Sequence, residues 1–440
     1  MQLLLVQFID PTRQDPLPRF CPQLGAMAAM LAQQGQSLSL VACGGFDPAR
    51  LHDAIIEHRP ERMLMEIHPT TRTAARRTIV DIAENYKLPV VALGPDVTAR
   101  PGPALSQPGV EAVFLGEFEV TAGEYFRALS ESRDPAGLPG AWVRDADGVT
   151  KGAVRPPIGQ LDSLPAPDRD LFEMRRIVES TGEIPVEAAR GCAHWCGQCM
   201  NDWYLDLYED HGESVRRRGV ASLVDELAEL AEEYERAAAF RLGGHAVATD
   251  ADWLAEFAEA YPRRLKRPWR CYVPLVDVTP RSAELLARAG CEMVDTHIGS
   301  GSRFIREDVF GMRLTDKQIL ANVELLKNAG LTVIGRTFVG SPYESEITLE
   351  KAVKLAGQAR FDQLHAEVFY PIPSTRAEET CRENGWLAGD NEEAYWQHRS
   401  VLRMPGLSAD QIERTADRFN ALARRGDVRR LRKTLAKARS

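Results

Sequence analysis

Three closely spaced cysteines are the residues of this sequence with the clearest capacity for chemistry. Cys192, Cys196 and Cys199 are separated by three and then by two residues. Thiolates at this spacing can hold three corners of a cubic iron–sulfur cluster, whereas ferredoxin-type runs supply four cysteines. Three protein ligands leave one metal position open, as in catalytic metal sites that bind a substrate directly. The spacing therefore predicts an open iron–sulfur centre on one tight loop.

Two other interpretations of these cysteines remain open. A structural zinc site needs four ligands, and His194 could be the fourth, although it lies inside the loop. A disulfide would require an oxidising compartment. The remaining cysteines are scattered and mostly stand beside apolar residues, as buried, reduced thiols do: Cys21, Cys43, Cys271, Cys291 and Cys381. This usage favours a reducing cytoplasm.

Composition narrows the class of protein. The 440 residues suggest two to three domains, and 44 % hydrophobic with 27 % charged residues is ordinary for a globular chain. The net charge of −9 gives no overall basic field for nucleic acid. No apolar run approaches the roughly 20 residues that span a bilayer, and the first residues lack a basic leader. We therefore expect a cytoplasmic protein without a nucleic-acid or membrane partner.

The first part of the chain alternates short apolar runs with helical patterns. This alternation predicts a doubly wound, Rossmann-like parallel sheet over residues 1–140. The expected strands are 3–8, 38–43, 62–67, 89–94 and 112–117.

Ligands of such sheets bind at the carboxyl ends of the strands. The loops expected there offer hydroxyls, glycines and backbone donors that suit a large polar cofactor. No Gly-x-Gly-x-x-Gly or Gly-Lys-Ser/Thr motif follows a strand, which disfavours a dinucleotide or a nucleoside triphosphate. The candidate cofactor-binding residues are Thr70, Thr71, Gly94, Pro95, Thr98, Gly116 and Glu117.

Three further regions follow. Residues 141–182 are expected to form a hairpin and a proline-rich linker. Residues 183–375 contain six strand patterns separated by helical segments, which predicts a partial (β/α)6 barrel with its site at the strand carboxyl ends. Residues 376–440 are expected to be helical, and their basic run at 424–433 is interpreted as a solvated helix face.

Taken in order, these motifs resemble a known class. Thr70-Thr71-Arg72 and the other loop motifs come first, the connector 164–170 and the cysteine triad follow, and 338–344 and 370–375 end the last two strands. This order is similar to that of cobalamin-binding radical S-adenosylmethionine (SAM) enzymes, over roughly residues 1–390. The resemblance implies an N-terminal cobalamin domain, a radical SAM domain, a 4Fe–4S cluster, bound SAM and bound cobalamin.

Several positions depart from the pattern of that class. Gln198 stands where an aromatic residue often precedes the third cysteine. Gly243 and Gly244 match a glycine pair that contacts the methionine amino group, but His245 replaces the usual acid. Ser300 lies in the fourth-strand segment, where Gly299 replaces a glutamate. The resemblance implies that Gly243, Gly244 and Ser300 bind SAM, in a pose that these changes could alter.

The cobalamin assignment lacks one familiar motif. Cobalamin domains often carry Asp-x-His-x-x-Gly, which is absent here, as it often is in the radical class. His68, at the end of the third expected strand, is the nearest candidate for a lower cobalt ligand, and a hydrogen-bonded loop histidine is the alternative. A flavodoxin-like domain that binds nothing is the other reading of this region.

The resemblance implies a methyltransferase acting on an unactivated carbon or phosphorus of a small molecule or short peptide. Arg336, Tyr204 and His245 are the catalytic candidates; Arg336 could clamp an anionic group or form a structural ion pair. A flavodoxin or ferredoxin is expected as electron donor. The alternatives are a cobalamin-dependent cyclase or rearrangement enzyme, a methylthiotransferase on transfer RNA, and a non-catalytic metal-binding scaffold.

Overall fold

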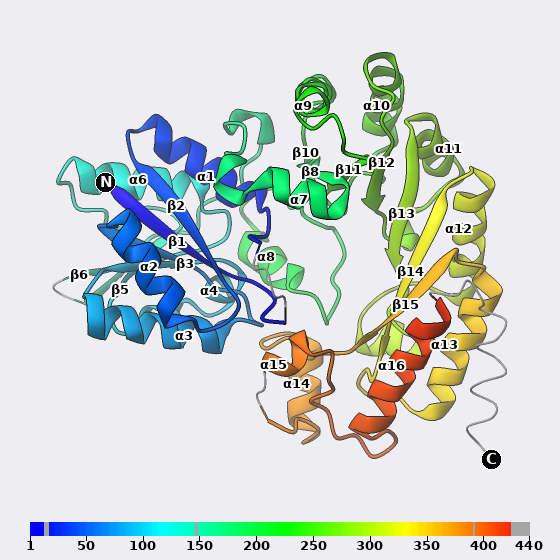
Figure 1. Cartoon of the computed structure of the whole chain (residues 1–440). Helices are drawn as coiled ribbons and strands as arrows, with labels where there is room; N and C mark the ends of the chain where they lie inside the picture. Colours follow the sequence, from blue (N-terminus) through cyan, green and yellow to red (C-terminus); the bar gives the residue numbers. More distant parts are fainter. Residues whose placement is uncertain (13–16, 146–147, 390–391, 424–440) are drawn as a thin grey trace. The chain divides into compact units, whose positions relative to one another are not determined.

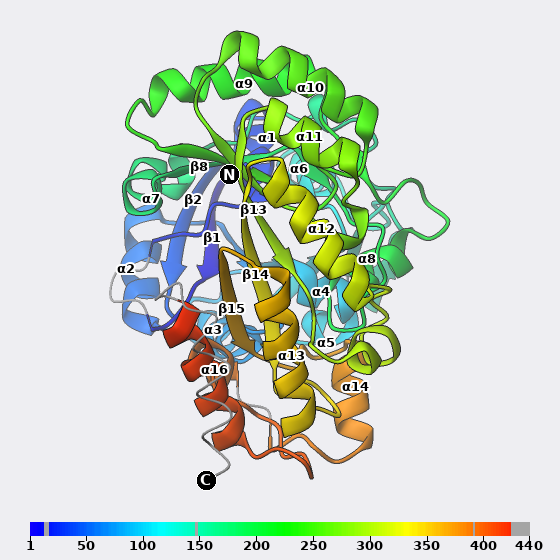
Figure 2. The same ribbon diagram turned by 90° about the vertical axis from the view of Figure 1, so that its right-hand side faces the viewer.

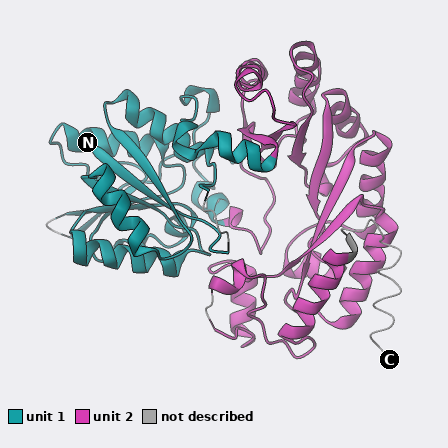
Figure 3. Ribbon diagram, in the orientation of Figure 1, with its two compact units in different colours: residues 1–181, 203–214 teal, residues 182–202, 215–440 magenta. Residues whose placement is uncertain are grey.

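The computed structural model describes residues 1–12, 17–145, 148–389 and 392–423. It divides into two compact units, coloured in Figure 3: unit 1 holds Met1–Thr181 with Trp203–Ser214, and unit 2 holds Gly182–Asp202 with Val215–Ser440. Residues 203–214 lie in the range expected for the partial barrel, but they belong to unit 1. Among the residues described, no helix is both long enough and apolar enough to cross a membrane.

Unit 1 contains one sheet, with strand order β2-β1-β3-β4-β5-β6-β7 (Figure 1). The first five strands are parallel, and β6 and β7 add an antiparallel hairpin. The predicted doubly wound fold is confirmed. The strands are β1 (Gln2–Phe8), β2 (Ser37–Cys43), β3 (Arg62–Glu66), β4 (Val90–Leu93), β5 (Val110–Phe114), β6 (Ala141–Asp145) and β7 (Gly148–Lys151).

Apolar side chains on both faces of this sheet explain why it folds between two helix layers. Leu4 and Val6 pack in one core cluster with residues of α2 and α3, while α1 and α6 pack against each other. Such near-continuous apolar strands are typical of parallel sheets covered on both faces. The helical segments of this part are α1 (Pro22–Gln33), α2 (Pro48–His58), α3 (Arg72–Asp81), η1 (Ile82–Tyr86), α4 (Pro95–Ala99), α5 (Pro101–Leu105) and α6 (Glu119–Ser130).

The proline-rich connector packs onto unit 1. A side chain at Gly25 in α1 would stand 2.8 Å from Cβ of Pro167, and the Asp168 amide donates to the Gly25 carbonyl oxygen. The connector is therefore held against the first helix at a point where only glycine leaves room. Its helical turns are η2 (Leu161–Ser163), η3 (Asp170–Phe172) and α7 (Met174–Thr181).

Unit 2 contains six parallel strands in the order β15-β14-β13-β12-β11-β8, which forms an open partial barrel sheet as predicted. Figures 1 and 2 draw the helices α9–α13 along one side of this sheet. The strands are β8 (Glu183–Glu187), β11 (Ala239–Gly243), β12 (Trp269–Tyr272), β13 (Cys291–His297), β14 (Thr332–Val339) and β15 (Gln363–Val368), with a short separate pair, β9 (Ala189–Arg190) and β10 (Arg216–Arg217).

Local sequence signals begin these helices. Thr279, Thr315 and Ser345 form capping boxes at the starts of α11, α12 and α13, and the Asp250 carboxylate caps α10. The bounds are α9 (Val220–Glu233), α10 (Ala251–Arg264), η4 (Leu275–Asp277), α11 (Pro280–Arg288), η5 (Ile305–Val309), α12 (Asp316–Asn328) and α13 (Glu346–Ala359).

The region after β15 is helical, as expected. It contains α14 (Arg376–Glu383), α15 (Glu392–Trp396) and α16 (Ala409–Ala423). The side chain of Ile412 in α16 fills the space above Gly340, at the end of β14, where a Cβ atom would approach it to 2.7 Å. The basic run at 424–433 lies outside the described residues.

Candidate functional site

The cysteine loop follows β9 and ends at α8 (Asn201–Tyr208). Its centre, Gly197, is held by two backbone hydrogen bonds from distant segments of unit 2. The Gly197 amide donates to the Phe310 carbonyl oxygen at 2.9 Å, and the Ala377 amide donates to the Gly197 carbonyl oxygen at 2.8 Å. The loop thus adopts a fixed shape because segments more than a hundred residues away bind its backbone.

Asn201 closes the loop from inside. Its Nδ2 donates to the carbonyl oxygens of Cys192, at 3.0 Å, and His194, at 3.4 Å. Its backbone amide donates to Sγ of Cys199 at 3.4 Å. An amide aimed at sulfur favours the thiolate that a metal requires. Asn201 therefore both shapes the loop and supports one of the proposed ligands.

A charged pair anchors the end of the loop. Nη2 of Arg376, at the start of α14, donates to Oδ2 of Asp202 at 2.8 Å, and Nε donates to the same oxygen at 3.2 Å. Asp202 is buried, with a side chain 11 % exposed, so this ion pair is partly shielded from water. Removing one partner of such a pair leaves a charge that is costly to bury.

The pKa values of all three loop thiols are raised above the ordinary value. Burial is the main cause that raises the pKa of Cys192 to about 11 and that of Cys196 to about 12, with neighbouring cysteines adding to both. Burial also raises the pKa of Cys199. Without metal these thiols hold their protons at neutral pH, so metal binding must release protons.

His194, the possible fourth ligand of a structural zinc site, binds another side chain in the structure. Within the described ranges, no three His, Cys, Asp or Glu side chains converge around a single metal ion. His194 turns to Asp277, with Nε2 2.8 Å from Oδ2, and this hydrogen bond is the first cause that raises the pKa of His194. The assignment of Cys192, Cys196 and Cys199 as the ligands of a 4Fe–4S cluster stays a prediction.

The glycine pair after β11 lies beside the cysteine loop's strand. A Cβ atom at Gly244, whose φ is +109°, would stand 2.4 Å from the Ala189 carbonyl oxygen. Only glycine permits this close approach of two backbones. The ring of His245 lies 4.5 Å from that of Tyr272, and burial, followed by the charge of His194, lowers the pKa of His245. His245 is thus a neutral imidazole near the loop.

The loops after β13 and β14 meet at Glu344, which is fully shielded in unit 2. Its Oε2 accepts the amides of Gly340, at 2.6 Å, and Ser341, at 3.2 Å, while Oε1 accepts the hydroxyl of Ser300 at 3.3 Å. Burial raises the pKa of Glu344 to about 7 despite these bonds. The predicted SAM contact Ser300 is therefore fixed by a carboxyl group from the next loop.

Seven charged side chains alternate in sign across the unit 2 sheet, and we call them the charge ladder. Arg241 lies 2.9 Å from Glu183 and 2.6 Å from Asp295, and Arg336 lies 3.5 Å from Asp295 and 2.8 Å from Glu367. Arg270 links Glu183, at 2.7 Å, with Glu292, at 2.6 Å. The order is Glu292, Arg270, Glu183, Arg241, Asp295, Arg336 and Glu367.

Arg336 is therefore paired with two carboxylates of its own sheet. These ion pairs raise its pKa although burial alone would lower it. They favour the structural alternative for this residue, and its role as a catalytic or cofactor-binding group stays a prediction.

In unit 1, His68 and its neighbours form a compact turn after β3. Nδ1 of His68 lies 3.0 Å from Oγ1 of Thr70, and the hydroxyl of Thr71 donates to the His68 carbonyl oxygen. Burial, followed by the charge of Arg19, lowers the pKa of His68 to about 4. Its imidazole is neutral at pH 7, the state that a metal ligand requires.

The turn after β4 shows why Gly94 and Thr98 stand where they do. Gly94 has φ +107°, and a Cβ atom there would lie 2.8 Å from the Ile67 carbonyl oxygen. Pro95 begins α4. The Thr98 hydroxyl donates to the Gly94 carbonyl oxygen at 3.1 Å and accepts the Gly116 amide at 3.0 Å. Thr98 thus joins the turns after β4 and β5.

Two tyrosines of α8 lie at these turns. The Glu117 amide donates to the hydroxyl oxygen of Tyr208 at 2.7 Å, and Tyr204 forms a side-chain hydrogen bond with Thr98. A Cβ atom at Gly116 would lie 2.1 Å from the Tyr208 hydroxyl oxygen. The structure brings Thr98, Gly116, Glu117 and Tyr204 together, and their cofactor-binding and catalytic roles remain predictions.

Four residues with clear positions at these sites were not among the sequence candidates for binding or catalysis: Asn201, Asp277, Arg376 and Tyr208. Asp277 and Arg376 act from segments far from the cysteines, so no spacing rule could indicate them. Asn201 was accessible in principle, because a side-chain amide two residues after a ligand cysteine can return to the loop backbone.

The comparisons agree with this arrangement. Residues 186–356 match the family model described as "Radical SAM superfamily". This range includes all three cysteines, the end of β8 and four complete strands of the barrel sheet, β11, β12, β13 and β14. This part of the chain, which carries the cysteine triad on the loop after β9, is therefore similar to a radical SAM domain.

Curated relatives extend the likeness beyond that domain. The chain is 26 % identical over 343 residues to the "Uncharacterized methyltransferase PH0819" of Pyrococcus horikoshii, covering 77 % of this chain and 73 % of that protein. It is 23 % identical over 363 residues to the "Cytidylyl-2-hydroxyethylphosphonate methyltransferase" of Streptomyces wedmorensis, covering 73 % of this chain and 66 % of that one.

Solved structures share the two-part fold. The radical SAM methyltransferase TsrM of Kitasatospora setae, solved with cobalamin and a 4Fe–4S cluster, matches with TM-score 0.66 and 18 % identity over 87 % of this chain and 75 % of that chain. The cobalamin-dependent radical enzyme OxsB matches with TM-score 0.66 and 14 % identity over 90 % of this chain and 56 % of that one.

Proposed function

We propose that this chain is a cobalamin-dependent radical SAM methyltransferase acting on a small molecule. One observation carries the proposal: a three-cysteine loop in a radical SAM domain follows a Rossmann-like unit in the fold order of TsrM and OxsB. Both curated relatives are named methyltransferases, and one of them is named for a phosphonate substrate. Carbon and phosphorus both remain possible acceptor atoms.

The residues of unit 2 supply the binding and the rigidity. Cys192, Cys196 and Cys199 would hold the 4Fe–4S cluster, which together with SAM and cobalamin would supply electron transfer and a carrier for the methyl group. Asn201 and the Asp202–Arg376 pair keep the loop in one shape, which spares the site reorganisation during the reaction. Backbone groups at Gly243 and Gly244, with Ser300, are the proposed contacts of SAM.

In unit 1, the turns after β3, β4 and β5 are the proposed cobalamin contacts. Thr70, Thr71, Gly94, Pro95, Thr98, Gly116 and Glu117 present hydroxyls and backbone groups there. His68, whose pKa is lowered by burial, is the imidazole that would serve as the cobalt ligand. Because it lies within hydrogen-bonding distance of Thr70 through Nδ1, only Nε2 would remain for the metal.

The reaction needs an outside source of single electrons, for which we propose a flavodoxin or ferredoxin. The free thiols of the chain suit a reducing compartment, and we propose the cytoplasm. A cobalamin-dependent cyclase or rearrangement enzyme is the second candidate. It is supported by the likeness to OxsB, whose name specifies a radical enzyme and no methyl transfer.

The experiment has two parts, both on anaerobically purified full-length protein. Iron, sulfide and cobalt are measured first, and we expect a 4Fe–4S cluster and bound corrinoid. The protein is then incubated with a metabolite extract, a reductant and SAM labelled in its methyl group. Label in a product one methylene heavier supports methyl transfer. Consumption of SAM without transfer of label favours the second candidate, and absence of both metals contradicts the proposal.

A further inference from the structure

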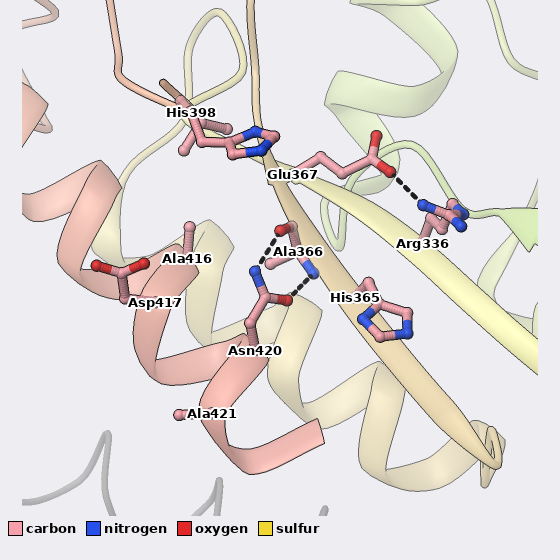
Figure 4. Close-up of a pocket in the computed structure, with 10 residues that line it drawn as sticks. Arg336, His365, Ala366, Glu367, His398, Ala416, Asp417, Asn420 and Ala421 are labelled. Atoms are coloured by element: carbon pink, nitrogen blue, oxygen red, sulfur yellow. Dashed lines mark hydrogen bonds and ion pairs between the residues drawn. The ribbon is translucent and has the colours of Figure 1, made fainter. Parts of the chain in front are cut away.

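A cavity of about 690 Å³ lies in unit 2 beside the edge strand β15 (Figure 4). This volume falls within the range of roughly 300–1,000 Å³ found for small-molecule sites. Its walls come from β14, β15, the segment before α16, and α16 itself. The lining residues are Arg336, His365, Ala366, Glu367, Val368, His398, Ala416, Asp417, Asn420 and Ala421.

One wall of the cavity is fixed by a side chain that hydrogen-bonds to the backbone of the edge strand, as a neighbouring strand would. Asn420 of α16 accepts the Ala366 amide through Oδ1 at 2.8 Å and donates through Nδ2 to the Ala366 carbonyl oxygen, also at 2.8 Å. Figure 4 shows both bonds. They satisfy backbone groups at the edge of the sheet and hold α16 against it. The cavity is therefore formed before any ligand arrives.

Two residues of the charge ladder, Arg336 and Glu367, line this cavity. The ladder contains four carboxylates and three guanidinium groups, and it begins and ends with a carboxylate. Glu292 is one end, and Glu367, which lines the cavity, is the other. The positive charge of Arg336 is already shared between Asp295 and Glu367, so it is poorly placed to hold an anion.

Glu367 retains an oxygen for another partner. Its Oε1 accepts Nη1 of Arg336 at 2.8 Å, while Oε2 is 3.9 Å from Nε2 of His297, which is too long for a hydrogen bond. His297 cannot supply the missing charge, because burial lowers its pKa to about 4. Asp417 adds a second carboxylate to the lining, as Figure 4 shows.

We infer that this cavity binds the protonated amino group of a small molecule, with Glu367 as its contact. A carboxylate that already bonds one cation can accept a second through its other oxygen. The inference rests on the proposed function only in taking the occupant to be the substrate. An amino-bearing substrate would then be distinguished from its hydroxyl and carboxylate analogues.

Binding of three probes of similar size tests the inference: 2-phenylethylamine, 2-phenylethanol and 3-phenylpropanoate. Each is titrated into the full-length protein by saturation-transfer NMR at low and at physiological salt. We expect the amine to bind best and to weaken as salt rises. Glu367→Gln should weaken the amine roughly threefold to tenfold, since the contact is half exposed, and should leave the alcohol unchanged.

Glu292→Gln is the matched control, because it removes the other terminal carboxylate of the ladder. The two side chains have nearly equal exposure, 40 % and 39 %, and each bonds one arginine. Equal losses of amine affinity in both variants would overturn the inference. So would equal or undetectable binding of the three probes by the unmodified protein.

A chain that lacks residues 424–440 tests whether this basic segment, instead of a small molecule, supplies the cation that binds in the cavity. Residues 424–440 carry eight Lys and Arg residues and one Asp. A large gain in amine affinity after their deletion would assign the cavity to the tail and overturn the inference, whereas unchanged affinity supports it. Iron content and SAM cleavage are measured on the same samples, so failure of the proposed function is seen separately.

Discussion

At the scale of single residues, the cysteine loop shows how few side chains define the chemistry. The three thiols have raised pKa values because of burial and of one another, so an empty loop holds neutral thiols. Metal binding must remove those protons, and the free energy of metal coordination offsets the cost of deprotonating the thiols. A ligand cysteine therefore cannot be exchanged for a small apolar residue without loss of the centre.

We expect Cys192→Ala, Cys196→Ala and Cys199→Ala each to abolish the visible absorption of the cluster, since two thiolates cannot hold it. Iron and acid-labile sulfide per chain are the measurements. Cys21→Ala is the control, because this cysteine is also partly exposed but lies at the start of α1. Retention of full iron by any of the three loop variants would refute the ligand assignment.

The pattern of the triad, its place after a strand, and the glycine pair were visible in the sequence because they are local. The residues that hold the loop in place were not visible in the sequence. Arg376 lies 174 positions after Asp202, and no rule of spacing connects them. The charge ladder was equally hidden, although Arg336 was conspicuous as a cation within an apolar strand. Its partners became known only with the register of β13, β14 and β15.

At the scale of elements, α14 supports the cysteine loop from outside. The Arg376–Asp202 pair and the Ala377 amide both come from its first turn. We expect Arg376→Ala to leave the fold intact and to speed loss of the cluster in air by roughly fivefold to tenfold, which corresponds to about 1–1.4 kcal/mol.

The decay of visible absorption after exposure to air measures this effect. Arg382→Ala is the control, since Arg382 forms its ion pair with Glu378 within the same helix. Equal decay rates for Arg376→Ala and the unmodified protein would remove α14 from this role.

Glu344 joins two loops and should make stability depend on pH. Its pKa in the folded protein is about 7, above the unfolded value near 4.5. The folded state therefore binds the proton more tightly, so stability contributed by this group is present at low pH and is lost as pH rises from about 4.5 to 7.

Glu344→Gln keeps an acceptor for the amides of Gly340 and Ser341 and cannot ionise. The urea midpoints of the variant and of the unmodified protein are compared at pH 5 and at pH 7.5. We expect the advantage of the variant to be larger at pH 7.5. A difference between the two proteins that does not change with pH would show that Glu344 does not titrate in this range. Glu346→Gln, at the exposed start of α13, is the control.

At the scale of the whole molecule, the alternation of the main strands and helices was predictable, because alternating apolar runs and helical patterns are strong signals. The short elements α4, α5, β9 and β10 were not predicted. The five strands predicted for the first part of the chain lie within a few residues of β1 to β5. The assignment of residues 203–214 was not predictable. They follow the cysteines directly, yet their contacts lie with unit 1 through Tyr204 and Tyr208.

A glycine substitution tests whether unit 1 holds the corrinoid at its strand-end turns. Gly116 has φ +67° and no room for a Cβ atom beside Tyr208. We expect Gly116→Ala to displace the turn and to reduce corrinoid retained after desalting by at least fivefold, a change equivalent to about 1 kcal/mol.

Gly137→Ala separates backbone strain from crowding. Gly137 also has positive φ, +81°, but nothing lies within 4 Å of an added Cβ atom. The Gly137→Ala variant should retain corrinoid, although its backbone strain costs about 1 kcal/mol, as in Gly116→Ala. The cobalt content and the visible spectrum decide, and equal retention by both variants would argue against a corrinoid site at this turn.

The charge ladder also bears on how the six strands find their partners during folding. A strand displaced by one residue exchanges its two faces. In unit 2 this would turn guanidinium and carboxylate groups toward positions now held by Leu242, Val294 and Val333, which are at most 1 % exposed. Charges left there without partners cost several kcal/mol each. The charge ladder thus disfavours wrong strand registers during folding, because a mispaired sheet would bury these charges, and it adds little to the stability of the correct sheet.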